Sequence, residues 1–295
     1  MSKLNGIFPP IPTPFISDEL SLVKLEHNFI KWNTTGLHGY VVMGSNGEGV
    51  FLTPEEKLRL TEAARKFAPD GKIIIAGTGS ESIRETISLT NRVADIGADY
   101  ALVLTPSYYK SEMKHESLIL YFTRVADASK IPVILYNVPK FTGVDLTADT
   151  VAQLAEHPNI VGIKNSTENI RQLIEFASGT PDDFEVLVGT ASILYNGLTS
   201  GATGAIVALA NVAPRECVQI QTHVKSKNYF EALALQQKTI PLNKLITTQY
   251  GVAGLKAAMD MLGYFGGEPR APLLPLSDEA KIDLKNVLDR TEIYT

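Results

Sequence analysis

Residues 131–164 read IPVILYNVPKFTGVDLTADTVAQLAEHPNIVGIK, and this stretch contains the pattern that predicts the fold. Two short apolar runs, 131–138 and 159–164, lie on either side of a segment with helical periodicity that begins at Leu146. Apolar runs that do not alternate with polar residues are typical of strands covered on both faces, as in a parallel sheet. The stretch is therefore predicted to form a strand, a helix and a second strand in succession.

The same arrangement recurs along most of the chain. Further helical segments begin near Thr53, Ser80 and Thr167, the first with Pro54 and two acidic residues in its opening turn. Successive apolar runs are about 20 to 35 residues apart, which is the length of one strand–helix unit. The remaining apolar runs are 6–15, 39–44, 72–77, 99–105, 184–189 and 203–209. Eight strands with this spacing predict an α/β fold, a closed (β/α)₈ barrel.

The domain organisation follows from where the last strand ends. From about 214 to 292 the sequence reads as helical throughout, which is more than one closing helix needs. We expect the barrel over residues 1–213, and closing and additional C-terminal helices packed on it over 214–295. No Ser/Pro-rich linker or charge block interrupts the repeat, so one barrel is favoured over two smaller domains. A chain of 295 residues, 44% of them hydrophobic, can bury a core of that size.

The charge balance bears on the kind of partner. Lys and Arg number 27 against 32 Asp and Glu, which gives a formal net charge of -5. Such a chain has no excess of basic residues with which to bind a polyanion. We therefore expect a small-molecule substrate and no nucleic acid.

Cysteine and histidine content bears on metals and location. The chain has one cysteine, Cys217, and five histidines that form no cluster with it, so no disulfide within the chain and no zinc-type ligand set are expected. We expect no metal and no cofactor. Prolines interrupt the apolar start of the chain, and no apolar run approaches the roughly 20 residues that span a bilayer. The expected location is the cytoplasm, away from membranes, with the mitochondrial matrix as an alternative, although no transit peptide is seen.

Lys164 is the first catalytic candidate. Barrel enzymes place catalytic groups at the carboxyl ends of strands. Lys72 and Lys130 precede their strands, whereas Lys164 ends one and is followed by Asn165 and Ser166. Burial there disfavours the ammonium form and leaves a neutral amine that can attack a carbonyl carbon. The alternative is a buried lysine paired with a carboxylate.

Two further strand ends carry polar groups. Tyr136 ends the strand before that of Lys164, where a phenol can relay protons; the alternative is a core tyrosine with a bonded hydroxyl. The strand 39–44 is followed by Ser45, Asn46 and Gly47. Glycines on both sides of this pair allow a turn that exposes backbone N–H groups to a carboxylate, and the Ser45 hydroxyl lies within reach of a tyrosine.

Five motifs in order resemble one family. They are GSNGE (44–48), TPSYY (105–109), YNVP (136–139), GIKNS (162–166) and GYFGGEPRAPL (263–273). Together they resemble the dihydrodipicolinate synthase and N-acetylneuraminate lyase family of pyruvate-dependent class I aldolases, over essentially the whole chain. The resemblance implies a carbon–carbon lyase, a 2-oxo acid substrate and a homo-oligomer, either a dimer or a tetramer built from dimers.

The resemblance also implies roles for the candidate residues. Lys164 would bind pyruvate as an imine and Tyr136 would shuttle protons. Ser45 and Asn46 would hold the pyruvate carboxylate through their N–H groups, and the Ser45 hydroxyl would link to the tyrosines.

Four further positions are assigned in the same way. Tyr108 matches the tyrosine that family members donate across a subunit interface to complete the relay, and Tyr109 beside it is the alternative. Gly189, which ends strand 184–189, would approach the bound keto acid. Ser166 and Phe141 are expected to contact the substrate as well.

Departures from the family pattern bear on the substrate. The synthases carry an arginine at the position of Phe141, which holds the second substrate's carboxylate, and usually Thr-Thr at the positions of Ser45 and Asn46. GSNGE, KNS and the 263–273 motif most resemble the 4-hydroxy-2-oxoglutarate aldolases, and 2-keto-3-deoxy sugar acid aldolases are close. We therefore expect reversible cleavage of a 4-hydroxy-2-oxo acid to pyruvate and an aldehyde.

Three alternatives stay open. The first is dihydrodipicolinate synthase activity, the condensation of pyruvate with aspartate semialdehyde. The second is N-acetylneuraminate lyase activity. The third is a keto-acid-binding regulatory homologue without activity, which would predict the loss of Lys164 or Tyr136, and both are present.

Overall fold

A computed structural model describes residues 4–293 and contains eight parallel strands in one sheet. From β4 to β10, each strand pairs with the next one along the chain, and β10 pairs with β1. The strands are β1 (Ile7–Phe8), β4 (Gly39–Val42), β5 (Ile73–Gly77), β6 (Tyr100–Leu104), β7 (Val133–Asn137), β8 (Ile160–Asn165), β9 (Glu185–Val188) and β10 (Gly204–Ile206). Each coincides with one of the eight predicted apolar runs, and only β8 extends past its run, by one residue, to Asn165.

Hydrogen bonds between the first and second barrel strands close the sheet. The N–H of His38 donates to the Ile7 carbonyl at 3.1 Å, and the N–H of Val41 donates to the Pro9 carbonyl at 2.9 Å. The N–H of Ile11 donates in turn to the Val41 carbonyl at 2.9 Å. The predicted (β/α)₈ barrel is thus confirmed.

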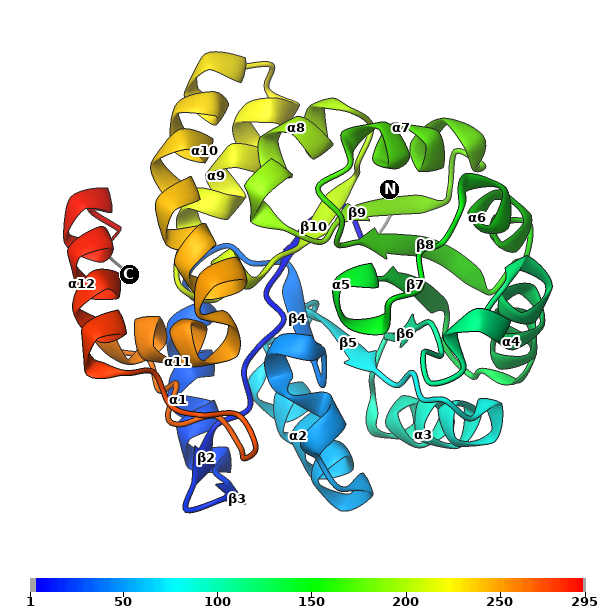
Figure 1. Ribbon diagram of the computed structural model, residues 1–295, viewed down its shortest axis with the longest axis horizontal. Coiled ribbons are helices and arrows are strands. Elements are labelled where there is room, and N and C mark those ends of the chain that lie inside the picture. The colour runs from blue at the N-terminus through cyan, green and yellow to red at the C-terminus, as the bar shows by residue number, and fades with distance from the viewer. Residues whose placement is uncertain (1–3, 294–295) are drawn as a thin grey trace.

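Helices surround the strands, as Figure 1 shows. They are α1 (Leu22–Trp32), α2 (Pro54–Phe67), α3 (Ile83–Ile96), α4 (His115–Ala128), α6 (Ala148–Ala155), α7 (Ile170–Gly179), α8 (Leu194–Thr199) and α9 (Pro214–Lys225). The sequence sets their ends. Thr53 accepts the Glu56 N–H while the Glu56 side chain accepts the Thr53 N–H, a reciprocal cap at the start of α2. Gly97 ends α3 at φ 106°.

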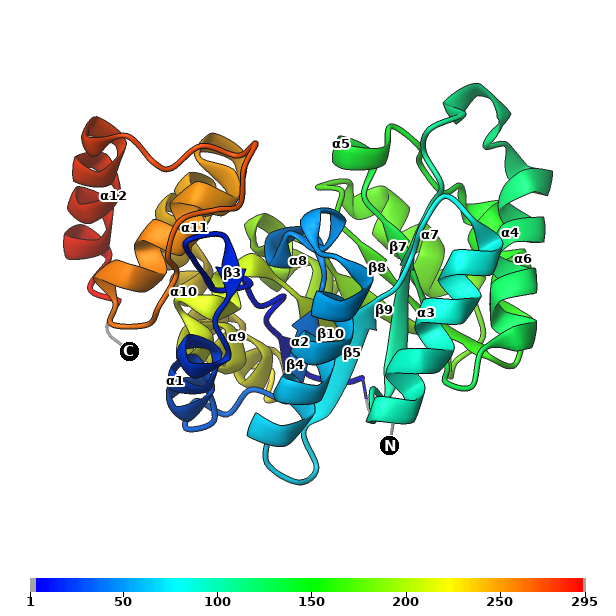
Figure 2. The same cartoon turned by 90° about the horizontal axis from the view of Figure 1, so that it is seen from below.

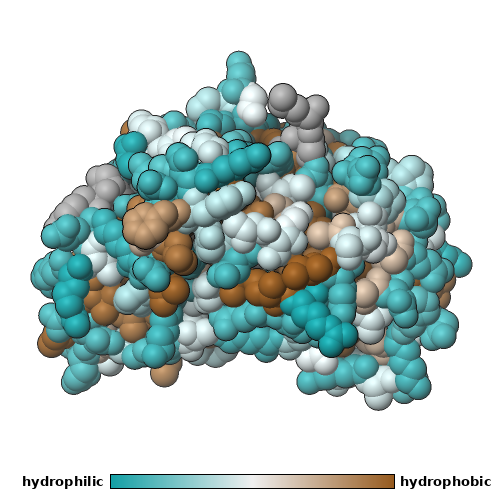
Figure 3. Space-filling model, turned by 90° about the horizontal axis from the view of Figure 1, so that it is seen from above, coloured by the Kyte–Doolittle hydropathy of each residue, from teal (hydrophilic) through white to brown (hydrophobic). Residues whose placement is uncertain are grey.

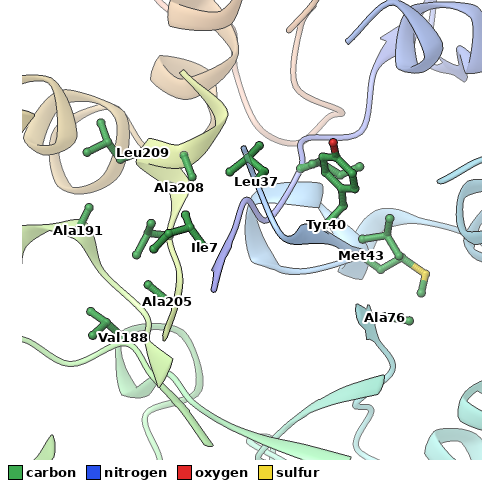
Figure 4. Packing of buried hydrophobic residues seen from close by; sticks show 14 of the residues in the cluster. Ile7, Leu37, Tyr40, Met43, Ala76, Val188, Ala191, Ala205, Ala208 and Leu209 are labelled. Carbon is green, nitrogen blue, oxygen red and sulfur yellow. The ribbon is translucent and has the colours of Figure 1, made fainter. Parts of the chain in front are cut away.

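The core has two layers. Side chains that point into the barrel, such as Phe8, Ile134 and Leu187, pack against one another. Alternate side chains point outward and pack beneath the helices, among them Ile7, Tyr40 and Val188 in Figure 4. On the face in Figure 3, hydrophilic side chains cover most of the surface and hydrophobic ones form separate patches. Within residues 4–293, no helix is long and apolar enough to cross a membrane.

The C-terminal part differs from its prediction in one respect. Helices α10 (Tyr229–Lys244), α11 (Gly251–Met261) and α12 (Asp278–Thr291) are present, with a π-helical turn at Leu245–Gln249. The segment 262–277 was expected to be helical but is not, because its glycines and prolines cannot continue a helix. It lies beside a hairpin of β2 (Phe15–Ile16) and β3 (Glu19–Leu20) that the sequence did not predict (Figure 1). The division of the chain at residue 213 stays a prediction.

Candidate active site

A cavity of about 260 Å³ lies at the carboxyl ends of the strands and contains most of the predicted site residues. An adjoining cavity of about 560 Å³ shares Ser45, Tyr136 and Phe141 with it. The short helix α5 (Pro139–Thr142) stands at this end of the barrel, at the upper edge of Figure 2. The predicted residues that line the first cavity are Ser45, Asn46, Tyr136, Phe141, Lys164, Ser166 and Gly189.

Lys164 and Tyr136 are directly paired neighbours on β8 and β7. The Lys164 Nζ lies 4.0 Å from the centre of the Tyr136 ring, and both side chains are buried. Among residues 4–293, no carboxylate forms an ion pair with Lys164. The described part of the chain therefore favours an available amine over the alternative of a structural ion pair.

The environment of Tyr136 favours its phenolate. Burial alone would raise the pKa of the phenol. The positive charge of Lys164, with hydrogen bonds from Ser45, Lys164 and Ser166, outweighs burial and brings the Tyr136 pKa below its ordinary value. A phenol of this kind can give up and take back a proton closer to neutral pH than a free tyrosine.

The turn after β4 contributes the third group. Residues Ser45–Gly47 form one short 3₁₀ turn, in which the Gly47 N–H donates to the Gly44 carbonyl at 2.9 Å. The N–H groups of Ser45 and Asn46 come before this first internal bond, where a helical turn offers no partner. The Ser45 Oγ lies 3.3 Å from the Tyr136 Oη, so the expected link between hydroxyl and phenol is present.

Gly189 and Ser166 lie against each other on neighbouring strand ends. The Ser166 hydroxyl donates to the Gly189 carbonyl at 3.3 Å. A Cβ atom at position 189 would stand 2.2 Å from the Ser166 Oγ and 2.6 Å from the Asn165 carbonyl oxygen. Close packing therefore accounts for the glycine on its own, and its contact with a keto acid stays a prediction.

Tyr108 lies apart from the other predicted residues. Its side chain is 77% exposed, its ring contacts that of Tyr109, and it does not line either cavity of the single chain. The Glu81 carboxylate accepts the N–H groups of Ser107 and Tyr108 and so fixes the loop. The role of Tyr108, and the choice between it and Tyr109, stay predictions.

Several residues in or next to the site were not predicted. Asn137 and Asn165 directly follow Tyr136 and Lys164, and the Asn137 Nδ2 donates to the Asn165 Oδ1 at 3.0 Å on the opposite, helix-facing side of the two strands. In the sequence, the feature that could have pointed to these two asparagines is their position directly after the two catalytic candidates. Thr247 and Val252 line both cavities from the C-terminal helices, and no sequence pattern near them indicated this. Lys140 lines both cavities as well.

The described residues contain no group of three or more His, Cys, Asp or Glu side chains that could hold a metal ion. The polar groups that do converge are an amine, a phenol, a hydroxyl and backbone N–H groups. Such a set can bind a carboxylate and form a covalent adduct with a ketone.

Comparisons with known proteins agree with this arrangement. Residues 3–291 match the sequence profile of the Dihydrodipicolinate synthetase family. The 4-hydroxy-tetrahydrodipicolinate synthase of Methanothrix thermoacetophila is 38% identical over 293 residues, which cover 99% of this chain and 98% of that protein. That of Roseobacter denitrificans is 35% identical over 278 residues, 94% of each chain.

Solved structures give the same result. The dihydrodipicolinate synthase of Aquifex aeolicus superposes with a TM-score of 0.93 at 31% identity, over 98% of each chain. The chloride-inhibited enzyme of Acinetobacter baumannii, complexed with pyruvate, superposes with a TM-score of 0.94 at 32% identity, over 98% of this chain and 99% of that one.

Proposed function

Because the chain belongs to the dihydrodipicolinate synthetase family and is thus a pyruvate-dependent class I aldolase, we propose that it cleaves a 4-hydroxy-2-oxo acid reversibly to pyruvate and an aldehyde. The observation that carries the chemistry is the buried Lys164 amine, 4.0 Å from the centre of the Tyr136 ring, with the Ser45 hydroxyl 3.3 Å from the phenol. The proposed catalytic residues are these three.

The reaction begins with imine formation. The Tyr136 phenolate takes a proton from the Lys164 ammonium, and the neutral amine attacks the C2 carbonyl carbon of the substrate. The carbinolamine then loses its hydroxyl as water to leave a protonated imine. The Ser45 and Asn46 N–H groups bind the C1 carboxylate during this step. Tyr136 donates the proton that the departing hydroxyl needs, since its hydroxyl is buried beside the amine.

The carbon–carbon bond breaks in the second step. The Tyr136 phenolate takes the proton of the C4 hydroxyl, the C3–C4 electron pair moves into the protonated imine, and the aldehyde leaves. The Tyr136 phenol gives this proton to C3 of the resulting enamine, and water then hydrolyses the imine, which releases pyruvate and the free Lys164 amine. The protonated imine accepts the electron pair of the broken bond, a role that a metal ion has in other aldolases. The steps therefore use only groups of the chain, the substrate and water.

One residue of the cavity lining bears on which substrate the protein uses. Phe141, on α5, lines both cavities where the synthase pattern has an arginine, and its side chain is 63% exposed. An apolar ring there offers no partner to the carboxylate of a semialdehyde. This position supports the cleavage reaction.

The second candidate is condensation of pyruvate with aspartate semialdehyde. The relatives are named 4-hydroxy-tetrahydrodipicolinate synthases, and these names support the second candidate better than the first. Lys140 lines both cavities and could bind the carboxylate in place of an arginine. Parallel kinetics with 4-hydroxy-2-oxoglutarate, a 2-keto-3-deoxy sugar acid, N-acetylneuraminate and aspartate semialdehyde plus pyruvate would decide. The proposal expects the highest kcat/KM among the first two.

Assembly and location are part of the proposal. We propose a cytoplasmic homo-oligomer, either a dimer or a tetramer built from dimers, because the exposed Tyr108 needs a neighbouring subunit to reach a reacting group. One similar solved structure is described as a monomeric synthase variant, so the fold alone does not determine the assembly. Sedimentation of the purified protein tests this, and a monomer with full activity would contradict it.

A further inference from the structure

Glu48, the last residue of the GSNGE turn, forms an ion pair with Lys256 inside the protein. The Glu48 Oε1 lies 2.6 Å from the Lys256 Nζ, and both side chains are fully buried. The second carboxylate oxygen of Glu48, Oε2, accepts a hydrogen bond from the backbone N–H of Arg270 at 2.7 Å. The turn that follows β4 is thus joined to α11 and to the segment 262–277, far away in the sequence.

The backbone at Glu48 shows that the turn is held under constraint. Its φ of 55° and ψ of 33° lie in the left-handed region, which a residue with a side chain adopts at a cost. The Glu48 N–H donates to the Ser45 carbonyl at 3.2 Å, and the Glu48 carbonyl accepts the Phe51 N–H at 2.9 Å. A movement of Glu48 would therefore move Ser45.

The partners of Glu48 are themselves fixed. The Lys256 Nζ donates to the Glu268 carbonyl at 3.0 Å and stands 4.6 Å from the centre of the Phe15 ring. The Arg270 guanidinium forms two hydrogen bonds with the Glu56 carboxylate, at 2.6 and 2.7 Å. Glu48 is therefore bound to two residues that are themselves held by several contacts.

Stability alone is a weak reason for such a pair. Two charges removed from water gain little over apolar side chains of the same size, whereas one charge left without its partner is strongly destabilising. A buried pair does fix the relative position of the two segments that supply it. Here one of those segments carries Ser45 and Asn46.

We propose that Glu48 and Lys256 are positioning residues for recognition of the 2-oxo acid carboxylate. They hold the turn so that the Ser45 and Asn46 N–H groups face a carboxylate while the Ser45 hydroxyl stays beside Tyr136. This inference rests on the proposed function, in which that turn binds pyruvate. Neither residue touches the reacting atoms, so their loss should weaken binding of the 2-oxo acid more than it slows the chemical step.

The test compares Glu48→Gln, Lys256→Met and the double variant with the wild type. For each protein, borohydride trapping gives the pyruvate concentration for half-maximal labelling, cleavage assays give kcat at saturation, and circular dichroism gives the melting temperature. All kinetics are run where every variant is folded. Asp99→Asn is the control at the opposite end of the barrel. Asp99, which precedes β6, also accepts a backbone N–H and pairs with a cation, Arg65, although this pair is partly exposed.

Each single variant should raise the half-maximal pyruvate concentration about tenfold or more and change kcat less than about threefold. The double variant removes both charges, so its melting temperature should return towards the wild-type value while its pyruvate binding stays weak. Asp99→Asn should lower the melting temperature only.

The inference is overturned by either of two results. One is wild-type pyruvate binding in a folded single variant. The other is a double variant that regains pyruvate binding together with stability, which would make the pair merely structural. A wild-type protein that traps no pyruvate would instead overturn the proposed function.

Discussion

The amine of Lys164 and the phenol of Tyr136 occupy paired positions on adjacent parallel strands, with the Lys164 Nζ 4.0 Å from the centre of the Tyr136 ring. Side chains at paired positions of parallel strands point the same way, so the barrel sets this contact through backbone register. Because the two groups are neighbours on a rigid sheet, the phenol is in place to serve every proton transfer around the imine carbon.

Replacing Tyr136 by phenylalanine should lower kcat for cleavage about 100-fold or more, because the ring stays in place while the proton carrier is lost. Pyruvate should still form a trappable imine with Lys164, although more slowly. Steady-state kinetics and trapping on the same sample check this. A Tyr136→Phe enzyme with wild-type kcat would show that another group moves the protons.

Removal of the Ser45 hydroxyl should shift the pH profile in a defined direction. The Ser45 bond to the phenol is one of the interactions that lower the Tyr136 pKa, so Ser45→Ala should raise that pKa. In the proposed mechanism the phenolate is the base in bond cleavage, so kcat should rise with pH as Tyr136 ionises. The rising limb of the Ser45→Ala profile should therefore lie at higher pH than that of the wild type, and an unshifted or lower limb argues against the phenolate as base.

Chelators should leave the activity unchanged, because the protonated imine accepts the electron pair that a class II aldolase directs to its metal ion. The measurement is cleavage of 4-hydroxy-2-oxoglutarate before and after prolonged treatment with EDTA and gel filtration. Loss of activity that a divalent cation restores would contradict the proposed chemistry.

An arginine at position 141 should change the substrate ranking. A charged contact to a substrate carboxylate typically changes kcat/KM roughly a hundredfold. Phe141→Arg should therefore raise kcat/KM for condensation with aspartate semialdehyde relative to cleavage of 4-hydroxy-2-oxo acids.

Phe141→Leu, which keeps the position apolar, is the control for this change. If the wild type already prefers the semialdehyde, the synthase reaction is its function and Lys140 is the first residue to test as the carboxylate ligand. Lys140→Met would then lose that preference.

Strand ends could be located from the sequence because a glycine, a proline or a polar residue marks the end of most apolar runs. Lys164 and Tyr136 were found in this way, and their contact followed from the order of strands in a parallel barrel. The β2–β3 hairpin escaped prediction because its strands have two residues each and its turn uses Ser17 and Asp18 at positive φ instead of glycine.

Other features depend on contacts between distant segments. The Glu48–Lys256 pair joins positions that no local pattern relates. The glycines at 263, 266 and 267 belong to the GYFGGEPRAPL motif, and they also disfavour a helix in segment 262–277. Tyr108 is exposed in one chain, so no property of the single chain shows which group it reaches. The role proposed for Tyr108 requires a neighbouring subunit.

The proposed reaction requires an imine between pyruvate and Lys164. Incubation with pyruvate and borohydride, followed by peptide mass mapping, identifies the lysine that forms it. We predict one reduced pyruvate adduct per chain on the Lys164 side chain, and none when Lys164→Ala is treated in the same way. An adduct on Lys110, Lys140 or another lysine in the wild type, or labelling of Lys164→Ala at the wild-type rate, would contradict it.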